Sequence, residues 1–193
     1  ALAVFQIRRD LGVNGDITDE TLERLKSDVP DEDNCDALAR YPRKPTEFGL
    51  DIPMIASQAA IPACNEALRN SPDVVRFQIQ YGRALLAANR TDDAMNALEP
   101  SARLGYPAAE TAIAWMHEAG MLSGKGKPDH VNALRWYRLA AEDAYAPALF
   151  AIGRFTDAGL GGIKRSDTES LTWYRQAAAI GYPPAQTELG KKY

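Results

Sequence analysis

The stretch WYRLAA at residues 136–141 returns as WYRQAA at residues 173–178, a shift of 37 positions. A second block, which precedes a helix start each time, recurs as GYPAA at 105–109, AYAPA at 144–148 and GYPPA at 181–185. A fixed period of this length is the sequence signature of a repeat architecture, in which every unit is one supersecondary element. The repetition therefore decides the fold class before any helix is assigned.

Each unit is predicted to be a pair of helices. Apolar residues recur at helical spacing, as at Ala109, Ile113 and Met116, and such a stripe packs against neighbouring helices. The glycine-rich links at 123–128 and 159–162 supply turns between the two helices of a unit. Because a pair cannot close a core alone, we expect an all-α solenoid of stacked units over residues 73–193.

Two smaller features support this prediction. Asp129 and Ser166 follow the glycine-rich links at the places where helix N-caps belong. Equivalent positions in successive units carry small residues, namely Ala114, Gly153 and Gly190. Small side chains at these positions would let the axes of crossing helices approach closely.

Charge and hydropathy exclude some partners. The chain of 193 residues has 22 Lys and Arg against 26 Asp and Glu, a net charge of -4, whereas a nucleic-acid surface normally carries positive charge. The longest uncharged stretch, residues 52–65, falls short of the roughly 20 apolar residues that a spanning helix needs. We expect no nucleic-acid partner and no membrane insertion.

No set of residues indicates catalysis. Cys35 and Cys64 show neither zinc-ligand nor CxxC spacing. His117 falls at a repeat position expected to be aromatic and packed, and His130, which follows the predicted cap, is expected to be solvated. The GxG patterns have no preceding strand, so they do not indicate a phosphate site. We expect no catalytic residue, no cofactor and no metal, and therefore no enzyme.

The recurring residues resemble the Sel1-like repeat family, a variant of the tetratricopeptide helix-turn-helix. The resemblance extends over residues 73–193 and is carried by the Trp-Tyr and Ala-Ala pairs together with Ala148, Gly153 and Gly159. The chain departs from the pattern at Ala144, where the family has Gly. The resemblance implies a non-catalytic adaptor whose superhelix offers a concave face to another protein.

The repeated aromatic residues are expected to pack between helices. This set consists of Trp136, Tyr137, Trp173 and Tyr174. A ligand platform for sugars or bases would not need the same residues in successive units, so we interpret the set as repeat core.

Positions that differ between units are the predicted contacts with a partner. Trp115 is the large aromatic among them, and an exposed aromatic beside charged groups is typical of a protein hot spot. The full set of predicted contacts on the first helices of the units is Trp115, Arg83, Arg154, Glu118 and Asp157.

Residues 1–28 resemble the closing half of a small three-helix peptidoglycan-binding domain. The resemblance rests on Phe5-Gln6, on LGVNGD at 11–16, and on Thr18 followed by Leu22 and Leu25. It implies peptidoglycan as a second partner. The alternative is a helical hairpin that docks on the solenoid and caps it.

Residues 29–72 form a proline-rich connector with short helices expected at 34–41 and 55–69. Its cysteines, Cys35 and Cys64, are hypothesised to form a disulfide, because the wall-binding-like segment suggests an oxidising compartment. Such a bridge closes a loop of about 30 residues and would contribute roughly 3 to 4 kcal/mol. Two buried thiols are the alternative.

Three functional hypotheses follow. The first is an exported bacterial interaction protein, periplasmic or extracellular, that binds another protein; a cytoplasmic location stays open. The second is a peptidoglycan-binding module that the solenoid merely positions. The third is the carboxy-terminal regulatory arm of a larger enzyme such as a protease, because the chain begins at Ala1 inside an amphipathic segment.

Overall fold

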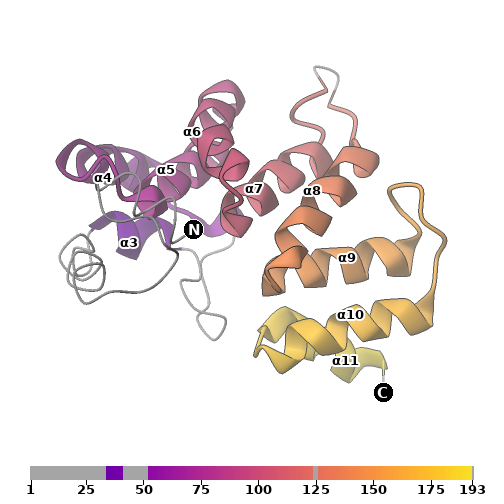
Figure 1. Ribbon diagram of the computed structural model, residues 1–193. Coiled ribbons are helices and arrows are strands. Elements are labelled where there is room, and N and C mark those ends of the chain that lie inside the picture. Colours follow the sequence, from indigo (N-terminus) through magenta and orange to yellow (C-terminus); the bar gives the residue numbers. More distant parts are fainter. Residues whose placement is uncertain (1–33, 41–51, 124–125, 193) are drawn as a thin grey trace, which may run out of the picture.

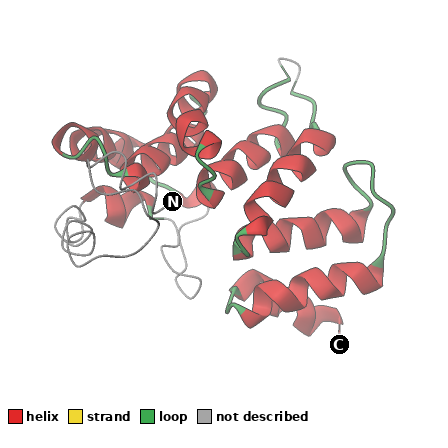
Figure 2. Cartoon of the chain, in the orientation of Figure 1, coloured by secondary structure: helices red, strands yellow, loops and turns green. Residues whose placement is uncertain are grey.

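The structure is a computed structural model that describes residues 34–40, 52–123 and 126–192 (Figure 1). All regular elements in these ranges are helical, with no strand (Figure 2), so the all-α prediction is confirmed. The elements are α3 (Asn34–Ala39), the 3-10 turn η1 (Ile52–Met54), α4 (Ser57–Asn70), α5 (Val75–Ala87), α6 (Thr91–Arg103), α7 (Pro107–Glu118), α8 (His130–Glu142), α9 (Ala146–Ala158), α10 (Asp167–Ala179) and α11 (Pro183–Lys192).

The helices form hairpins that stack along a curved path (Figure 1). The hairpins are α5–α6, α7–α8 and α9–α10, and each is joined to the next because its second helix packs on the first helix that follows. The first helices also touch one another, α5 against α7 and α7 against α9. The first helices therefore lie next to one another along one face of the solenoid.

Local sequence signals define where the helices begin. The Asp129 carboxylate accepts a hydrogen bond from the Asn132 backbone N–H at 3.0 Å, and Ser166 Oγ accepts one from the Glu169 backbone N–H at 3.2 Å. Both predicted N-caps are confirmed. Helices α7 and α9 start instead with proline in the first turn, where its missing N–H has no helical partner to lose.

The turn before each of these first helices needs a left-handed backbone. Gly105 and Gly181 adopt φ values of +76° and +94° there. The equivalent residue between the two central hairpins is Ala144, which adopts φ +52° although it has a Cβ. This conformation costs an L-residue about 1 to 2 kcal/mol, so the departure from the family pattern is a point of strain.

A small residue on a first helix is needed for packing only where another helix lies against it. A Cβ built on Gly153 would lie 2.6 Å from Tyr174 Cε1, so the ring of Tyr174 packs directly on the backbone of α9. A Cβ on Gly190 would meet nothing within 4 Å. The expected close approach therefore exists at Gly153 and is absent at Gly190, because among the described elements only α10 packs substantially on α11.

The repeated aromatic residues divide into two kinds. Tyr137 and Tyr174 are 2% exposed and lie inside the hairpins. Trp136 and Trp173 are only half-buried, and each packs against two neighbouring hydrophobic clusters. The tryptophans thus join adjacent units rather than fill the centre of one unit.

Helices α3 and α4 pack as part of the same stack. Helices α3 and α4 both contact α5, and one hydrophobic cluster that includes Ala60, Cys64, Phe77 and Ala84 crosses the expected boundary at residue 73. The two short helices expected in the connector are present as α3 and α4, and each observed helix end lies within two residues of its expected position. The peptidoglycan-binding-like segment, residues 1–28, lies outside the described residues.

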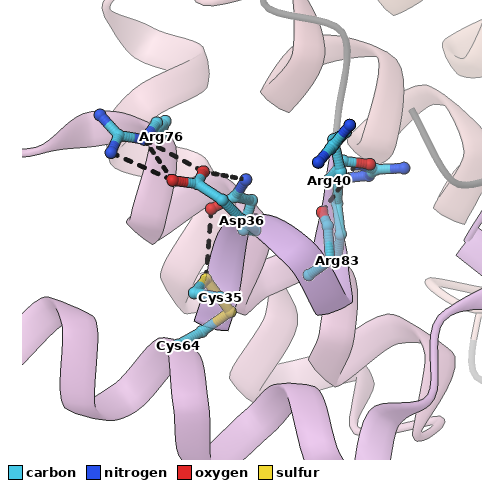
Figure 3. Close-up of a disulfide and its surroundings, with 8 residues drawn as sticks. Cys35, Asp36, Arg40, Cys64, Arg76 and Arg83 are labelled. Atoms are coloured by element: carbon cyan, nitrogen blue, oxygen red, sulfur yellow. Dashed lines mark hydrogen bonds and ion pairs between the residues drawn. A yellow bond between two sulfur atoms is a disulfide. The ribbon is translucent and has the colours of Figure 1, made fainter. Parts of the chain in front are cut away.

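A disulfide and a buried ion pair attach α3 to this stack (Figure 3). Cys35 of α3 and Cys64 of α4 are bonded, with their Cα atoms 4.5 Å apart. Beside the bridge, the fully buried Asp36 carboxylate accepts hydrogen bonds from Arg76 Nε at 3.1 Å and from Gln80 Nε2 at 2.9 Å. A six-residue helix is too short to be stable alone, and these contacts supply its stability.

Candidate functional site: a groove on the first helices

A groove of about 460 Å³ opens on the face that the first helices form. Its lining comes from η1, α5, α7, α9 and α11, with Tyr137 of α8 at its floor. Its volume lies within the range of about 300 to 1,000 Å³ that is usual for ligand sites. The groove spans several hairpins, so it exists only because the units stack.

Half-buried aromatic rings form one wall of the groove. Trp115 comes from α7, Tyr145 and Phe150 from the start and middle of α9, and Tyr182 from the residue before α11. The Phe150 and Tyr182 rings meet edge to face with centroids 5.5 Å apart. These rings are packed against the core on one side, so the groove presents rigid apolar surfaces.

Prolines lie beside these rings. Pro147, Pro183 and Pro184 line the groove at the starts of α9 and α11. The Tyr-Pro block begins α7, α9 and α11, and stacking brings the starts of α9 and α11 together at the groove. A block that the sequence marks as a helix start is therefore also part of the candidate site.

Arg154 is the exposed cation of the groove, and its orientation is fixed from the previous unit. Its Nη2 donates to Glu118 Oε1 at 2.9 Å and to Oε2 at 3.1 Å, and Arg154 is 44% exposed against 18% for Glu118. The Tyr137 hydroxyl donates to Glu118 Oε2 at 2.7 Å. One carboxylate thus holds both a groove cation and a buried hydroxyl.

The surroundings keep these groups in the protonation states that the contacts require. Burial, and then the Glu118 carboxylate, raise the pKa of Tyr137 well above its ordinary value, so the phenol remains a donor. Burial alone would lower the pKa of Arg154, but Glu118, with smaller contributions from Tyr137 and Tyr174, opposes burial and the pKa is raised. Arg154 is therefore permanently charged.

An analogous ion pair follows one unit later. Lys192 Nζ of α11 lies 2.6 Å from Asp157 Oδ1 of α9, and the Ser170 hydroxyl donates to the same oxygen at 3.3 Å. Burial, and then the nearby Asp157 and Glu188 carboxylates, raise the pKa of Tyr174 to about 12. In both ion pairs, an acidic residue near the end of one first helix pairs with a basic residue on the next first helix, from α7 to α9 and from α9 to α11.

The five predicted contact residues have different environments in the structure. Trp115, Arg83 and Arg154 line the groove, and Glu118 reaches it through Arg154. Asp157 does not line it and instead holds Lys192. Glu118 and Asp157 each pair with a base of the following unit, and their role as partner contacts stays a prediction.

Arg83 is the buried member of this set. It is only 8% exposed, and its Nη1 donates to the carbonyl oxygens of Ala39 at 3.3 Å and Arg40 at 3.0 Å (Figure 3). The reason is the docking of α3 on α5, which sequence spacing does not reveal. Arg83 thus holds the end of α3 and at the same time lines the groove.

The histidines do not assemble a catalytic site with the cysteines. His117 Nδ1 lies 3.6 Å from Asp129 Oδ2, and burial lowers the pKa of His117 while Asp129 opposes that change. The expectation of a solvated His130 is wrong, because its half-buried ring packs edge to face on Phe155 of α9, 5.6 Å away. Both cysteines are bonded to each other, so neither is a thiol nucleophile here.

Within residues 34–40, 52–123 and 126–192, no group of three or more His, Cys, Asp or Glu could hold a metal ion. Their helices are also too short or too polar for any of them to cross a bilayer.

Comparison with known families assigns the two central hairpins. Residues 107–145 and 146–182 each match the Sel1 repeat family model. The chain therefore contains two Sel1-like repeats. The two matched Sel1 repeats contain the hairpins α7–α8 and α9–α10, and they supply Trp115, Phe150 and Arg154 to the groove. Sel1 repeat proteins generally mediate contacts between proteins.

Two solved structures resemble the chain. A crystal structure of a Sel1 repeat protein from Oxalobacter formigenes is 27% identical with a TM-score of 0.51, and the match covers 65% of this chain and 94% of that chain. A protective antigen of uropathogenic Escherichia coli strains that displays an SLR fold is 18% identical with a TM-score of 0.48, covering 91% of this chain and 36% of that one. No curated protein sequence matches the chain.

Proposed function

We propose that this Sel1-like repeat protein is a non-catalytic adaptor that binds a partner protein in the groove of the first helices. The observation that carries the proposal is the convergence on one groove of Trp115 from α7, Phe150 and Arg154 from α9, and Tyr182 from the turn before α11. Clustered aromatic residues with an arginine are the composition that dominates binding energy at protein interfaces.

We also propose that the protein acts outside the reducing cytosol, in the periplasm or beyond the cell. The Cys35–Cys64 bridge supports this, because structural disulfides persist mainly in oxidising compartments. Alkylation of free thiols in freshly lysed native cells tests it. Protein with no reactive thiol is the expected result, and two alkylated cysteines in native protein would refute it.

Photo-crosslinking in the native cell tests the adaptor role. A photoreactive phenylalanine analogue is placed at Pro183, which is exposed and lines the groove, or at Val131, which is 64% exposed on α8 and outside the groove. A covalent partner is expected from the first position and not from the second. Equal products from both positions, or none from either, would contradict the proposal.

The captured partner is then purified, and its affinity is measured directly. Trp115→Ala should weaken binding at least tenfold, because it removes the largest ring of the groove, while the helical circular dichroism signal stays unchanged. Sedimentation with insoluble peptidoglycan, with and without residues 1–30, tests the rival glycan-binding hypothesis. Loss of sedimentation on that deletion would favour the rival.

A further inference from the structure

We infer that the groove recognises an extended segment of polypeptide that combines prolines with acidic side chains. The inference rests on the proposed function and specifies the chemistry of the partner. Its support comes from two independent features of the groove, the arrangement of its rings and the sign of its charge.

The arrangement of the rings favours a polyproline II segment. Trp115, Phe150 and Tyr182 follow one another along the groove from α7 through α9 to α11. Aromatic-lined grooves are the usual receptors of proline-rich segments, whose preformed extended helix has three residues per turn and loses little entropy on binding. The apolar surfaces of these rings and of Pro147, Pro183 and Pro184 all line the groove, where pyrrolidine rings of a partner could pack against them.

A partner helix fits the groove less well. An α-helix with its side chains is about 10 to 12 Å across, and its backbone groups are already bonded internally. The groove holds about 460 Å³, and Tyr145 and Arg154 are among the large side chains that line it. An extended chain presents alternate side chains and unbonded carbonyls to such a surface, so it makes more contacts in the same space.

The charge of the groove favours an acidic segment. Among the described residues that line it, the charged side chains are Arg83 and Arg154, and no Asp or Glu is present, although the whole chain has a net charge of -4. The contrast is local, so a polyanion such as nucleic acid would still be repelled by the rest of the surface. A peptide with a few carboxylates would complement the positive charge of the groove.

Arg154 has donors left for such a carboxylate. Its Nη2 is the atom that Glu118 engages, while its Nε and Nη1 bond to no described group, and the side chain is 44% exposed. Glu118 holds the guanidinium in place, which lowers the entropy lost when a second carboxylate binds. Charge-assisted bonds from arginine to a carboxylate are among the strongest in proteins.

The first test is an unbiased one. A random heptapeptide library displayed on phage is selected on the wild-type chain in parallel with Trp115→Ala. The selected sequences should be enriched in Pro and in Asp or Glu, and this enrichment should disappear on Trp115→Ala. Enrichment in Lys and Arg, or in a helical apolar pattern, would overturn the inference.

The second test uses defined probes. Fluorescence anisotropy compares the labelled heptapeptide Glu-Pro-Pro-Glu-Pro-Pro-Glu with versions in which Lys replaces Glu or Ala replaces Pro. We expect the first to bind at least tenfold more tightly than either control. Arg154→Gln should abolish the preference for Glu over Lys, Arg154→Lys should retain part of it, and Val131→Ser, outside the groove, should change nothing.

The outcomes separate this inference from the proposed function. If the crosslinked partner occupies the groove through a segment without proline or acid, the inference fails and the adaptor role stands. If soluble peptidoglycan fragments displace the probe more effectively than the unlabelled peptide does, the groove is a glycan site and the inference fails. If neither partner nor peptide contacts the groove, both fail.

Discussion

Glu118 at the end of α7 and Arg154 of α9 are 36 residues apart in the chain, and their side chains meet at 2.9 Å. The contact joins one Sel1 repeat to the next on the groove side. Asp157 and Lys192, 35 residues apart, repeat it one unit later. The positions that differ most between units thus include the residues that fix how the units stack.

Removal of the Glu118 carboxylate should destabilise the protein mainly through Tyr137. Glu118→Ala is expected to cost about 1 to 3 kcal/mol, because it leaves the buried Tyr137 hydroxyl without its acceptor. Arg154→Ala should cost no more than about 1 kcal/mol, since the pair is partly exposed. Urea unfolding of Glu118→Ala in wild-type and Tyr137→Phe backgrounds measures the coupling, and equal costs in both would contradict this account.

Ala144→Gly should stabilise the chain. The native residue adopts φ +52°, a conformation that glycine reaches without strain, as at Gly105 and Gly181 in the equivalent turns. The expected gain is about 1 kcal/mol, after allowance for the extra freedom of glycine in the unfolded chain. Thermal unfolding measures this gain. The control is Ala141→Gly inside α8, which should lose about 0.5 to 1 kcal/mol of stability. A fall in Tm for Ala144→Gly would refute the prediction.

Glu110 should make stability fall as the pH rises. Burial in α7, and then the carboxylates of Asp143 and Glu142, raise its pKa from 4.5 to about 7. The folded state therefore holds a proton that the unfolded state releases, and stability is lost between pH 4.5 and 7 by about 1 to 3 kcal/mol. Glu110→Gln should flatten this dependence in urea titrations at several pH values, whereas Glu99→Gln, at an exposed ion pair, should not.

The Cys35–Cys64 bridge should contribute measurably to stability. Replacement of both cysteines by serine is expected to lower the free energy of unfolding by about 2 to 4 kcal/mol, because the unfolded chain loses a constraint over 29 residues. Dithiothreitol should lower the Tm of the native protein and leave that of the serine variant unchanged. An identical Tm with and without the reductant would show that the bridge constrains nothing.

The buried Asp36 should be more costly to alter than the disulfide. Asp36→Asn leaves Arg76, which is 8% exposed, without its carboxylate, and the expected loss is about 3 to 5 kcal/mol. Asp93→Asn removes a carboxylate from the half-exposed pair with Arg90 and should cost less than about 1 kcal/mol. Chemical denaturation of the two variants compares them, and similar losses would mean that burial of the pair contributes little.

Much of the fold could be predicted from local chemistry. The spacing of the Trp-Tyr block defines the length of a unit, and the residues Asp129 and Ser166 mark helix starts through hydrogen bonds within three residues. Such short-range contacts depend on neighbouring residues alone. The candidate site was predicted only in part: Trp115 and Arg154 line it, but the roles of Tyr145 and Tyr182 in the wall were missed.

The sequence by itself determined that the chain is a stack of helical pairs, because periodicity and capping are properties of short segments. Only the tertiary structure decided which of the variable side chains meet across units and which face the groove. Glu118 and Trp115 lie within one turn of α7, yet the first pairs with Arg154 and the second lines the groove. How one hairpin is rotated against the next decides which of the two side chains meets the neighbouring unit. That rotation arises from packing among many residues at once.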